Sequence, residues 1–391
     1  MEIQKRYKIC LLSDCYFPTV GGIQTHVYNL AQTLAAKGHS VHIVTNYIAS
    51  PVKKAGLNLL LQHEEHGIKL HYLHGLIFKG WNYRTFDLRI VYQATKVFKQ
   101  ERFDILHGHS VYSPLVLGCC LLAKQCNLPS VVTVHSLVGA SLFENIAITF
   151  FRPFLYSPNG FIAVSQIAKK YLSRYVSTKP IFVVRNGVQL PSVTPDVRKQ
   201  MRAKLGYSED DVVINCISRF TAKKGILVLP IVCSPILSKY LNVKLLLIGD
   251  GPLRHRIESK FAQEGLSQQV RLVGSVPYEQ VASYLCASDI FIFPFRMESF
   301  GIALLEAMAV GLPVVACASN GALEVVKKGG DGLLADSLEQ FQHYLELLIE
   351  DSLLRREFGM RGFISAQSRL HSWDYITDEI LQVYSEIIGR D

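Results

Sequence analysis

The sequence predicts an α/β protein with two Rossmann-like domains, each holding a doubly wound parallel sheet. Short apolar runs of strand length alternate with segments of helical periodicity, which is typical of parallel sheets covered by helices. The alternation restarts near the middle of the chain, and 391 residues are too many for one ordinary core. We therefore expect residues 1–188 to form an N-terminal domain and residues 189–372 a C-terminal domain.

The first half follows this pattern from its start. Residues 7–13 form an apolar run of strand length, and a loop then leads to Gly21, Gly22 and a helix that Gly38 ends. Helical segments are also expected before the last two strands of this half. The further strands are predicted at residues 40–46, 103–110 and 130–136.

The second half repeats the alternation after residues 183–198, where Asn-Gly and two prolines mark the crossing between domains. A helix is predicted from Phe300 to Val310. Residues 373–391 read as an amphipathic helix that we expect to pack back onto the first domain. Strands of the second sheet are predicted at residues 212–218, 243–251, 270–276, 289–295 and 313–319.

Composition limits the class of protein. With 49% hydrophobic and 19% charged residues, the chain is typical of a globular protein, which excludes a disordered one. The nine cysteines are an odd number without a CxxC pair, so we expect reduced, buried thiols in a cytoplasmic protein. No stretch approaches 18 uncharged apolar residues, so neither a secretory signal nor a membrane span is expected.

Positive charge is concentrated in the first half. Residues 1–190 hold 20 Lys and Arg against 8 Asp and Glu, whereas residues 191–391 hold 21 against 24. This asymmetry favours an anionic partner, such as the inner face of a membrane or a phosphorylated acceptor, with a solvated basic surface as the open alternative. Nucleic acid is not expected, because the lysines are scattered rather than clustered among aromatic residues.

Loops beyond the carboxyl ends of parallel strands are where such sheets bind ligands. Gly21 and Gly22 precede a helix and offer backbone N–H groups to an anion. The alternative is that the two glycines only form a tight turn. After the first strand of the second half, Arg219, Lys223 and Lys224 place cations beside a glycine. This arrangement suits a diphosphate, with plain surface charge as the alternative.

Two glutamates flank an apolar helix in the second half. Glu298 lies just before it, and the N–H groups of Phe300, Gly301 and Ile302 point at whatever lies ahead of the helix. Glu306 shares a helix face with Ile302, where a carboxylate suits hydrogen bonds to a ribose diol. A first-turn charge and a solvated residue are the structural alternative.

Three histidines lie at the ends of predicted strands, namely His107, His109 and His135. No cysteine or carboxylate joins them in a compact ligand set, so we expect no metal. We interpret one of them as a hydrogen-bonding partner of a sugar hydroxyl.

Taken together, five motifs resemble the family 4 glycosyltransferases of GT-B fold, and the similarity spans nearly the whole chain. The glutamate pair with its Ser-Phe-Gly start is the most specific of them. The resemblance implies a retaining transfer from a nucleotide diphosphate sugar, in a cleft between two Rossmann-like domains. The motifs are the Gly21-Gly22 loop, TVH at 133–135, ISRFTAKKG at 217–225, IGDGP at 248–252 and ESFGIALLEAMAVGLPVVA at 298–316.

The resemblance also implies roles for individual residues. Arg219 and Lys224 would hold the donor diphosphate, Glu306 the ribose and Glu298 the transferred sugar. The catalytic set implied in this way is His135, Glu298, Arg219 and Lys224. The donor-binding set is Gly21, Gly22, His109, Gly249, Val276, Ser299, Phe300, Gly301, Ile302 and Glu306.

Within the family, the first half is most similar to the catalytic subunit of the GPI-anchor N-acetylglucosaminyltransferase, through residues 13–45 and 132–139. It also resembles bacterial lipid and lipopolysaccharide glycosyltransferases. The chain departs from the common pattern with NGVQ at 186–189 and SNGALEVV at 319–326, where the family usually has NGVD and GGIPEVV. The linker and the sugar pocket are therefore where we expect differences.

What the resemblance implies is transfer of a hexosyl or N-acetylhexosaminyl group, from a donor that favours UDP, to a lipid or glycan acceptor. No metal or other cofactor is expected, because cations of the protein neutralise the diphosphate. A sugar-nucleotide epimerase or phosphorylase of similar fold is one alternative. A non-catalytic protein that binds membrane or nucleic acid is another.

Overall fold

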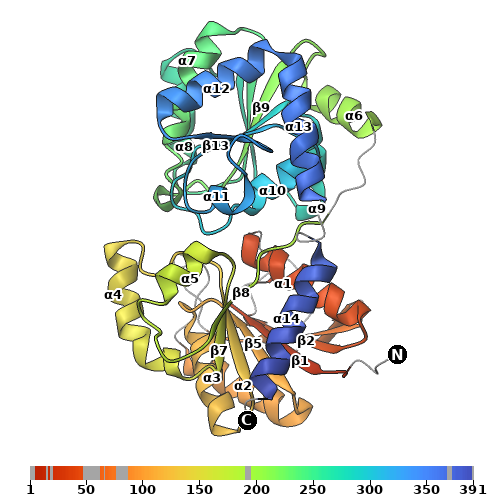
Figure 1. Cartoon of the computed structure of the whole chain (residues 1–391), viewed down its shortest axis with the longest axis vertical. Helices are drawn as coiled ribbons and strands as arrows, with labels where there is room; N and C mark the ends of the chain where they lie inside the picture. The colour runs from red at the N-terminus through yellow and green to blue at the C-terminus, as the bar shows by residue number, and fades with distance from the viewer. Residues whose placement is uncertain are drawn as a thin grey trace. The chain divides into compact units, whose positions relative to one another are not determined.

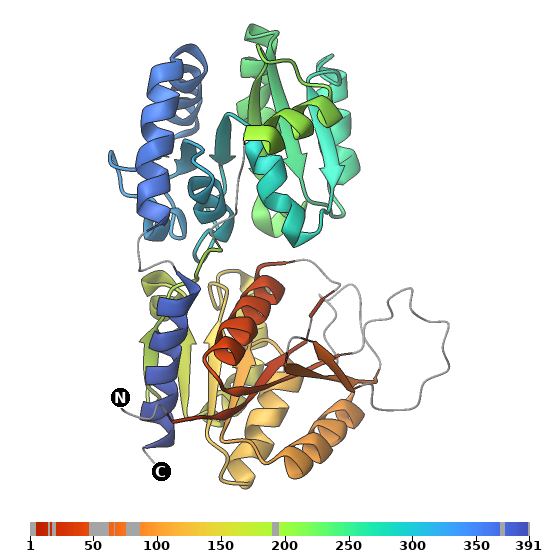
Figure 2. The same ribbon diagram turned by 90° about the vertical axis from the view of Figure 1, so that its right-hand side faces the viewer.

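The computed structural model describes residues 5–14, 16–17, 21–46, 62–65, 67–75, 87–189, 195–367 and 372–389. The chain divides into two compact units, each described by itself. Unit 1 comprises Met1–Gly187 with Trp373–Asp391, and unit 2 comprises Val188–Ser372. Each unit is a sheet with helices on its faces (Figures 1 and 2), which confirms the predicted α/β fold class.

Unit 1 is built on an eight-stranded sheet of order β3-β4-β2-β1-β5-β6-β7-β8, in which only the β3–β4 pairing is antiparallel among the described strands. The strands are β1 Lys8–Ser13, β2 Ser40–Asn46, β3 Gln62–Glu65, β4 Ile68–Leu73, β5 Ile105–His109, β6 Ser130–Val134, β7 Gly160–Ala163 and β8 Ile181–Val183. The helices are α1 Gly22–Ala36, α2 Leu88–Glu101, α3 Pro114–Gln125, α4 Leu142–Phe151, η2 Arg152–Tyr156, α5 Gln166–Leu172 and α14 Trp373–Ile388.

Alternation along β1 divides the core of unit 1 between the two faces of the sheet. Ile9 and Leu11 pack into one buried cluster with side chains of α1 and α14, whereas Cys10 and Leu12 pack into another with α2 and α3. The chain's last described helix, α14, therefore belongs to this unit, where it lies beside α1 (Figure 2). Its Tyr384 hydroxyl lies 2.6 Å from Nδ1 of His107 on β5.

Unit 2 is built on a six-stranded parallel sheet of order β11-β10-β9-β12-β13-β14. The strands are β9 Val212–Ile217, β10 Val243–Ile248, β11 Val270–Gly274, β12 Ile290–Phe293, β13 Val314–Cys317 and β14 Leu333–Ala335. The helices are α6 Pro195–Leu205, η3 Ala222–Lys224, α7 Val228–Lys239, α8 Arg254–Gln263, α9 Tyr278–Cys286, α10 Ile302–Ala309, α11 Ala322–Val325, α12 Leu338–Glu350 and α13 Ser352–Ala366.

The order of this sheet indicates the edge at which a ligand is expected to bind. The chain starts at β9, moves outward through β10 to β11, and then returns to the other side of β9 with β12. Loops leaving the carboxyl ends of β9 and β12 consequently run in opposite directions, and open α/β sheets bind ligands at this reversal.

The cysteines follow the expectation with one correction. Seven of the eight described cysteines are buried free thiols, but Cys126 is exposed because it caps the end of α3. Cys15 lies outside the described residues. Within the described ranges, no helix combines the length and the apolar character needed to cross a bilayer.

Two loops of unit 2 pack backbone against backbone through glycine. Gly249 has φ 124°, and a Cβ placed there would lie 1.9 Å from the carbonyl oxygen of Ser218. The Ser218 N–H donates to the Ile248 carbonyl at 3.0 Å, and the Phe220 N–H to the Asp250 carbonyl at 2.9 Å. The loop after β9 is therefore held against the loop after β10.

We predict that Gly249→Ala destabilises unit 2 far more than Gly206→Ala does. Both glycines have positive φ, so each alanine adds backbone strain of about 1–2 kcal/mol. Only at Gly249 does the new methyl also meet backbone, since nothing lies within 4 Å at Gly206. Urea unfolding followed by circular dichroism measures the difference, and equal losses in the two variants would contradict the packing described.

Candidate functional site in unit 2 and a histidine cluster in unit 1

The loops after β9 and β12 meet through an ion pair. Lys224 ends the short helix η3, and Glu298 lies five residues beyond the end of β12. The Lys224 ammonium donates a hydrogen bond to the Glu298 carboxylate, and both side chains are partly buried. This contact lies at the reversal of strand order, so the structure brings together two residues that the sequence had assigned to one site.

The Glu298 carboxylate is held ionised. Burial by itself would raise its pKa, but the Lys224 charge and the bonds donated by Lys224 and by Ser299 outweigh burial, so the pKa lies below its ordinary value. The Ser299 backbone N–H donates to Oε1 at 3.0 Å. The carboxylate is thus charged at neutral pH and fixed in direction.

Gly321 supports this loop from the neighbouring strand, a role that was not predicted from the sequence. A Cβ on Gly321 would lie 2.8 Å from the carbonyl oxygen of Glu298 and 2.9 Å from the backbone nitrogen of Phe300. The Asn-Gly pair after β13 was the available signal, because a glycine beyond a strand end permits close backbone approach. Without that approach the Glu298 loop could not lie where it does.

Helix α10 begins at this loop with an uncapped N-terminus. Gly301 has φ 91°, no side chain caps the helix, and its first turn holds no acidic residue. Among the described residues, the N–H groups of Ile302 and Ala303 have no acceptor, since the first turn has no intrahelical partner. The positive end of the helix therefore offers free donors to an anion beside Lys224 and Glu298.

Glu306 lies one turn further along α10. Burial raises its pKa to about 7, and no donor in the described parts of the chain bonds its carboxylate. A partly buried acceptor without a partner is one that a ligand hydroxyl can satisfy.

The remaining predicted residues of unit 2 lie on the adjoining loops. Arg219 is exposed on the loop after β9, and Gly249 lies directly beneath that loop. The Gly249 N–H donates to the Gly274 carbonyl at 2.8 Å, which ties in the loop carrying the buried Val276. Arg219, Lys224, Gly249, Val276, Glu298 and Glu306 thus lie on or next to the loops that leave one edge of the sheet.

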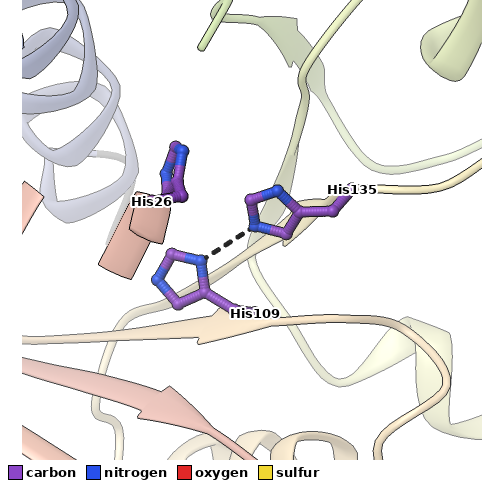
Figure 3. A group of neighbouring side chains, drawn as sticks. All are labelled: His26, His109 and His135. Carbon is purple, nitrogen blue, oxygen red and sulfur yellow. Dashed lines mark hydrogen bonds between the residues drawn. The ribbon is translucent and has the colours of Figure 1, made fainter. Parts of the chain in front are cut away.

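In unit 1 the predicted residues gather around a histidine cluster (Figure 3). His109 ends β5, His135 follows β6 directly, and Nδ1 of His109 lies 3.1 Å from Nε2 of His135. His26 of α1 completes the group, with its ring centroid 4.7 Å from that of His135. His26 was not predicted; the only signal was its place one turn after Gly22.

Four buried histidines of unit 1 are neutral at physiological pH. Burial lowers the pKa of His26 to about 4 and the pKa of His107 to about 3, and it holds those of His109 and His135 well below the ordinary value. His107 takes a structural role, because both of its ring nitrogens are bonded, one to Tyr384 and one to the Thr133 hydroxyl at 2.6 Å. His109 and His135 face His26 instead.

Gly21 and Gly22 lie at the start of α1. The Gly21 carbonyl accepts the Thr25 N–H at 3.1 Å, and neither a capping side chain nor an acid occupies the first turn. The N–H groups expected for anion binding are thus at a helix N-terminus, one turn from His26.

Comparison with known proteins covers both units. The family model "Glycosyltransferase Family 4" matches residues 20–190, and "Glycosyl transferases group 1" matches residues 197–363. One subunit of human phosphatidylinositol N-acetylglucosaminyltransferase is 27% identical, over 98% of this chain and 77% of that protein. Alpha-monoglucosyldiacylglycerol synthase of Streptococcus pneumoniae is 26% identical, over 79% of this chain and 70% of that one.

Among solved structures, the Anabaena protein HepE in complex with UDP-glucose superimposes with a TM-score of 0.79. The match covers 97% of this chain and 100% of HepE at 19% identity. At that identity the likeness shows the fold.

We predict that Glu306 makes the protein less stable as pH rises. Its folded pKa of about 7 exceeds the ordinary 4.5, so the folded state binds more protons between these values. The free energy of unfolding should therefore fall through this window because of Glu306. Glu306→Gln should flatten the fall in denaturation measured across that pH range. An unchanged slope would show that Glu306 does not titrate near neutrality.

Proposed function

The chain belongs to the family 4 glycosyltransferases of GT-B fold, and from this premise we propose that it transfers a hexosyl or N-acetylhexosaminyl group from a UDP-sugar. We propose a lipid or glycan as the acceptor, with retention of anomeric configuration. The observation that carries the proposal is the ion pair of Lys224 and Glu298 beside the uncapped N-terminus of α10. Lys224 and the helix N-terminus offer positive charge to a diphosphate, and the Glu298 carboxylate offers a hydrogen-bond acceptor to sugar hydroxyls.

The donor would be held by the loops of unit 2. Lys224, Arg219 and the free N–H groups of α10 attract the diphosphate, since charge-assisted bonds from such groups are the strong ones. Glu306 accepts the ribose hydroxyls, and the backbone of Val276 meets the base. UDP is supported by HepE, which has been solved with UDP-glucose, and N-acetylglucosamine by the name of the human relative.

Binding of the diphosphate would rearrange the ion pair. In the structure Glu298 is the partner of Lys224. A phosphate that takes over the ammonium leaves Glu298 free to accept hydroxyls of the transferred sugar. Its depressed pKa keeps it an acceptor at neutral pH, although loss of Lys224 as its partner would raise that pKa.

Retention follows if the acceptor attacks on the face that the nucleotide leaves. The bond from the anomeric carbon to the phosphate oxygen breaks, and the bond to the acceptor oxygen forms on the same face. The acceptor proton passes to the departing phosphate oxygen, so nucleoside diphosphate leaves. Arg219, Lys224 and the α10 dipole stabilise the growing negative charge without a metal. His135, neutral and next to His109, is assigned to a sugar hydroxyl by the family resemblance.

A lipid acceptor is supported by an apolar helix in unit 1. Helix α4 starts seven residues after His135, and of its side chains only Ile148 is buried. Leu142 is 79% exposed, Phe143 66% and Phe150 74%. An exposed apolar stripe of this kind is typical of an interaction surface.

Basic residues lie on the element bonded to α4. Tyr175, just beyond α5, donates its hydroxyl to the Asn145 side chain of α4 at 2.8 Å. Lys169, Lys170 and Arg174 are exposed on and after α5. Apolar and basic groups together suit an anionic membrane surface. We propose that α4 contacts such a surface.

We predict that Lys224→Ala lowers donor turnover by roughly 10² to 10³, as removal of one preorganised donor does. Lys204→Ala is the control, because it removes an exposed lysine from α6 of the same unit. The assay is UDP release by hydrolysis of UDP-glucose and UDP-N-acetylglucosamine, which needs no acceptor. Glu298→Gln should lose hydrolysis yet still bind UDP in calorimetry. Near wild-type turnover in folded Lys224→Ala removes the assignment.

We predict that the chain binds vesicles containing phosphatidylglycerol more tightly than vesicles of phosphatidylcholine alone. The double variant Phe143→Asp with Phe150→Asp should bind at least about tenfold more weakly, since each buried phenylalanine contributes about 1.5–3 kcal/mol. Leu353→Asp is the control, because this α13 side chain is 68% exposed in unit 2. Equal sedimentation of all three proteins would exclude α4 as the membrane contact.

A further inference from the structure

Three histidines of unit 1 converge from three separate elements. His26 comes from α1, His109 from the end of β5, and His135 from the loop after β6, and Figure 3 shows their rings around one common space. One ring nitrogen from each lies within 4.8 Å of the others. The His109–His135 separation of 3.1 Å is close to the roughly 3.3 Å that two nitrogens on one tetrahedral zinc ion require.

Two nitrogens of this cluster are buried without a partner. Within the described residues, Nε2 of His26 and Nε2 of His109 have no hydrogen-bond partner, and the two residues are 2% and 1% exposed. An unsatisfied buried polar atom costs about 1–3 kcal/mol. A ligand bound by Nε2 of His26 would recover that cost for this atom.

The tautomer of His26 is fixed by its other nitrogen. Nδ1 lies 2.9 Å from Oδ1 of Asn186, and an amide oxygen can only accept, so Nδ1 carries the proton. Nε2 therefore holds a lone pair directed away from Asn186. Metal-binding histidines are oriented in the same way, by a carbonyl or carboxylate that accepts from the nitrogen not bound to the metal.

From this geometry we propose that His26, His109 and His135 bind one divalent transition-metal ion of the zinc class. Three imidazoles leave the fourth tetrahedral position for water or a small ligand. Nitrogen ligands favour zinc, cobalt or nickel over magnesium and calcium, which prefer oxygen. The 3.1 Å contact between Nδ1 of His109 and Nε2 of His135 has one proton between its two nitrogens, so a metal that binds both requires that proton to move to the other nitrogen of its ring.

The second group of this kind in the described residues is less suited to a metal. His42, His71 and Glu101 also lie within reach of one another. However, the Lys8 ammonium donates to the Glu101 carboxylate at 2.7 Å and already neutralises it. A divalent cation would face that ammonium, so this group serves as the internal control.

The experiment titrates Co²⁺ into the full-length chain after removal of metals with EDTA. One equivalent should give the visible absorption of tetrahedral Co²⁺, and Zn²⁺ should abolish it. His26→Gln should lose the band, whereas His42→Gln should keep it. Asn186→Ala should retain the site with affinity lowered about 10- to 100-fold, as loss of an orienting partner does. Circular dichroism verifies that each variant is folded.

Absence of the band in the folded wild type overturns the proposal. So does a band that survives in folded His26→Gln or that disappears in His42→Gln. A further consequence rests on the proposed function: an ion on His135 would occupy the residue assigned to the sugar, so Zn²⁺ should inhibit hydrolysis of UDP-sugars. Metal binding without inhibition would remove the role of His135 and leave the metal site intact.

Discussion

The ion pair between Lys224 and Glu298 is the interaction on which the site of unit 2 depends. The two residues are 74 positions apart and meet only because β9 and β12 are neighbours in the sheet. Both side chains are partly buried, and a buried charge without a partner is strongly destabilising. Each charge therefore stabilises the other. The pair therefore holds the two loops in place. It also sets a cation beside a carboxylate, which suits a ligand with both a phosphate and hydroxyl groups.

The surrounding backbone makes this pairing possible. Gly249 lets the β9 loop rest on the β10 loop, and Gly321 lets the β13 loop support Glu298. Gly301 takes the positive φ that starts α10 with its N–H groups free. At Gly249 and Gly321 the neighbouring backbone occupies the space that a side chain would need, so the loops pack directly on one another. Unit 1 is different in kind, because His26, His109 and His135 are neutral and buried and can act as hydrogen-bonding groups or, as we propose, as metal ligands.

Much of unit 2 could be predicted from sequence, since β9, β10, β12 and β13 are apolar runs buried on both faces. Strand β4 was missed because its IKLHYL sequence mixes polar and apolar residues, and β7 because four residues carry too little periodicity. The cations and glutamates were recognised one by one. Their direct pairing was not, because strand order is a tertiary property. His26 was not predicted for the same reason, because a polar residue within a helix gives no indication of the strands that its side chain will face.

The most direct test of the ion pair's role is a crystal structure of the protein with UDP. We expect the diphosphate within hydrogen-bonding distance of Lys224 and of the N–H groups of Ile302 and Ala303, with the Glu306 carboxylate on the ribose. Lys224 should have exchanged Glu298 for phosphate. A nucleotide bound elsewhere, with the ion pair intact and the start of α10 empty, would contradict the proposed donor site.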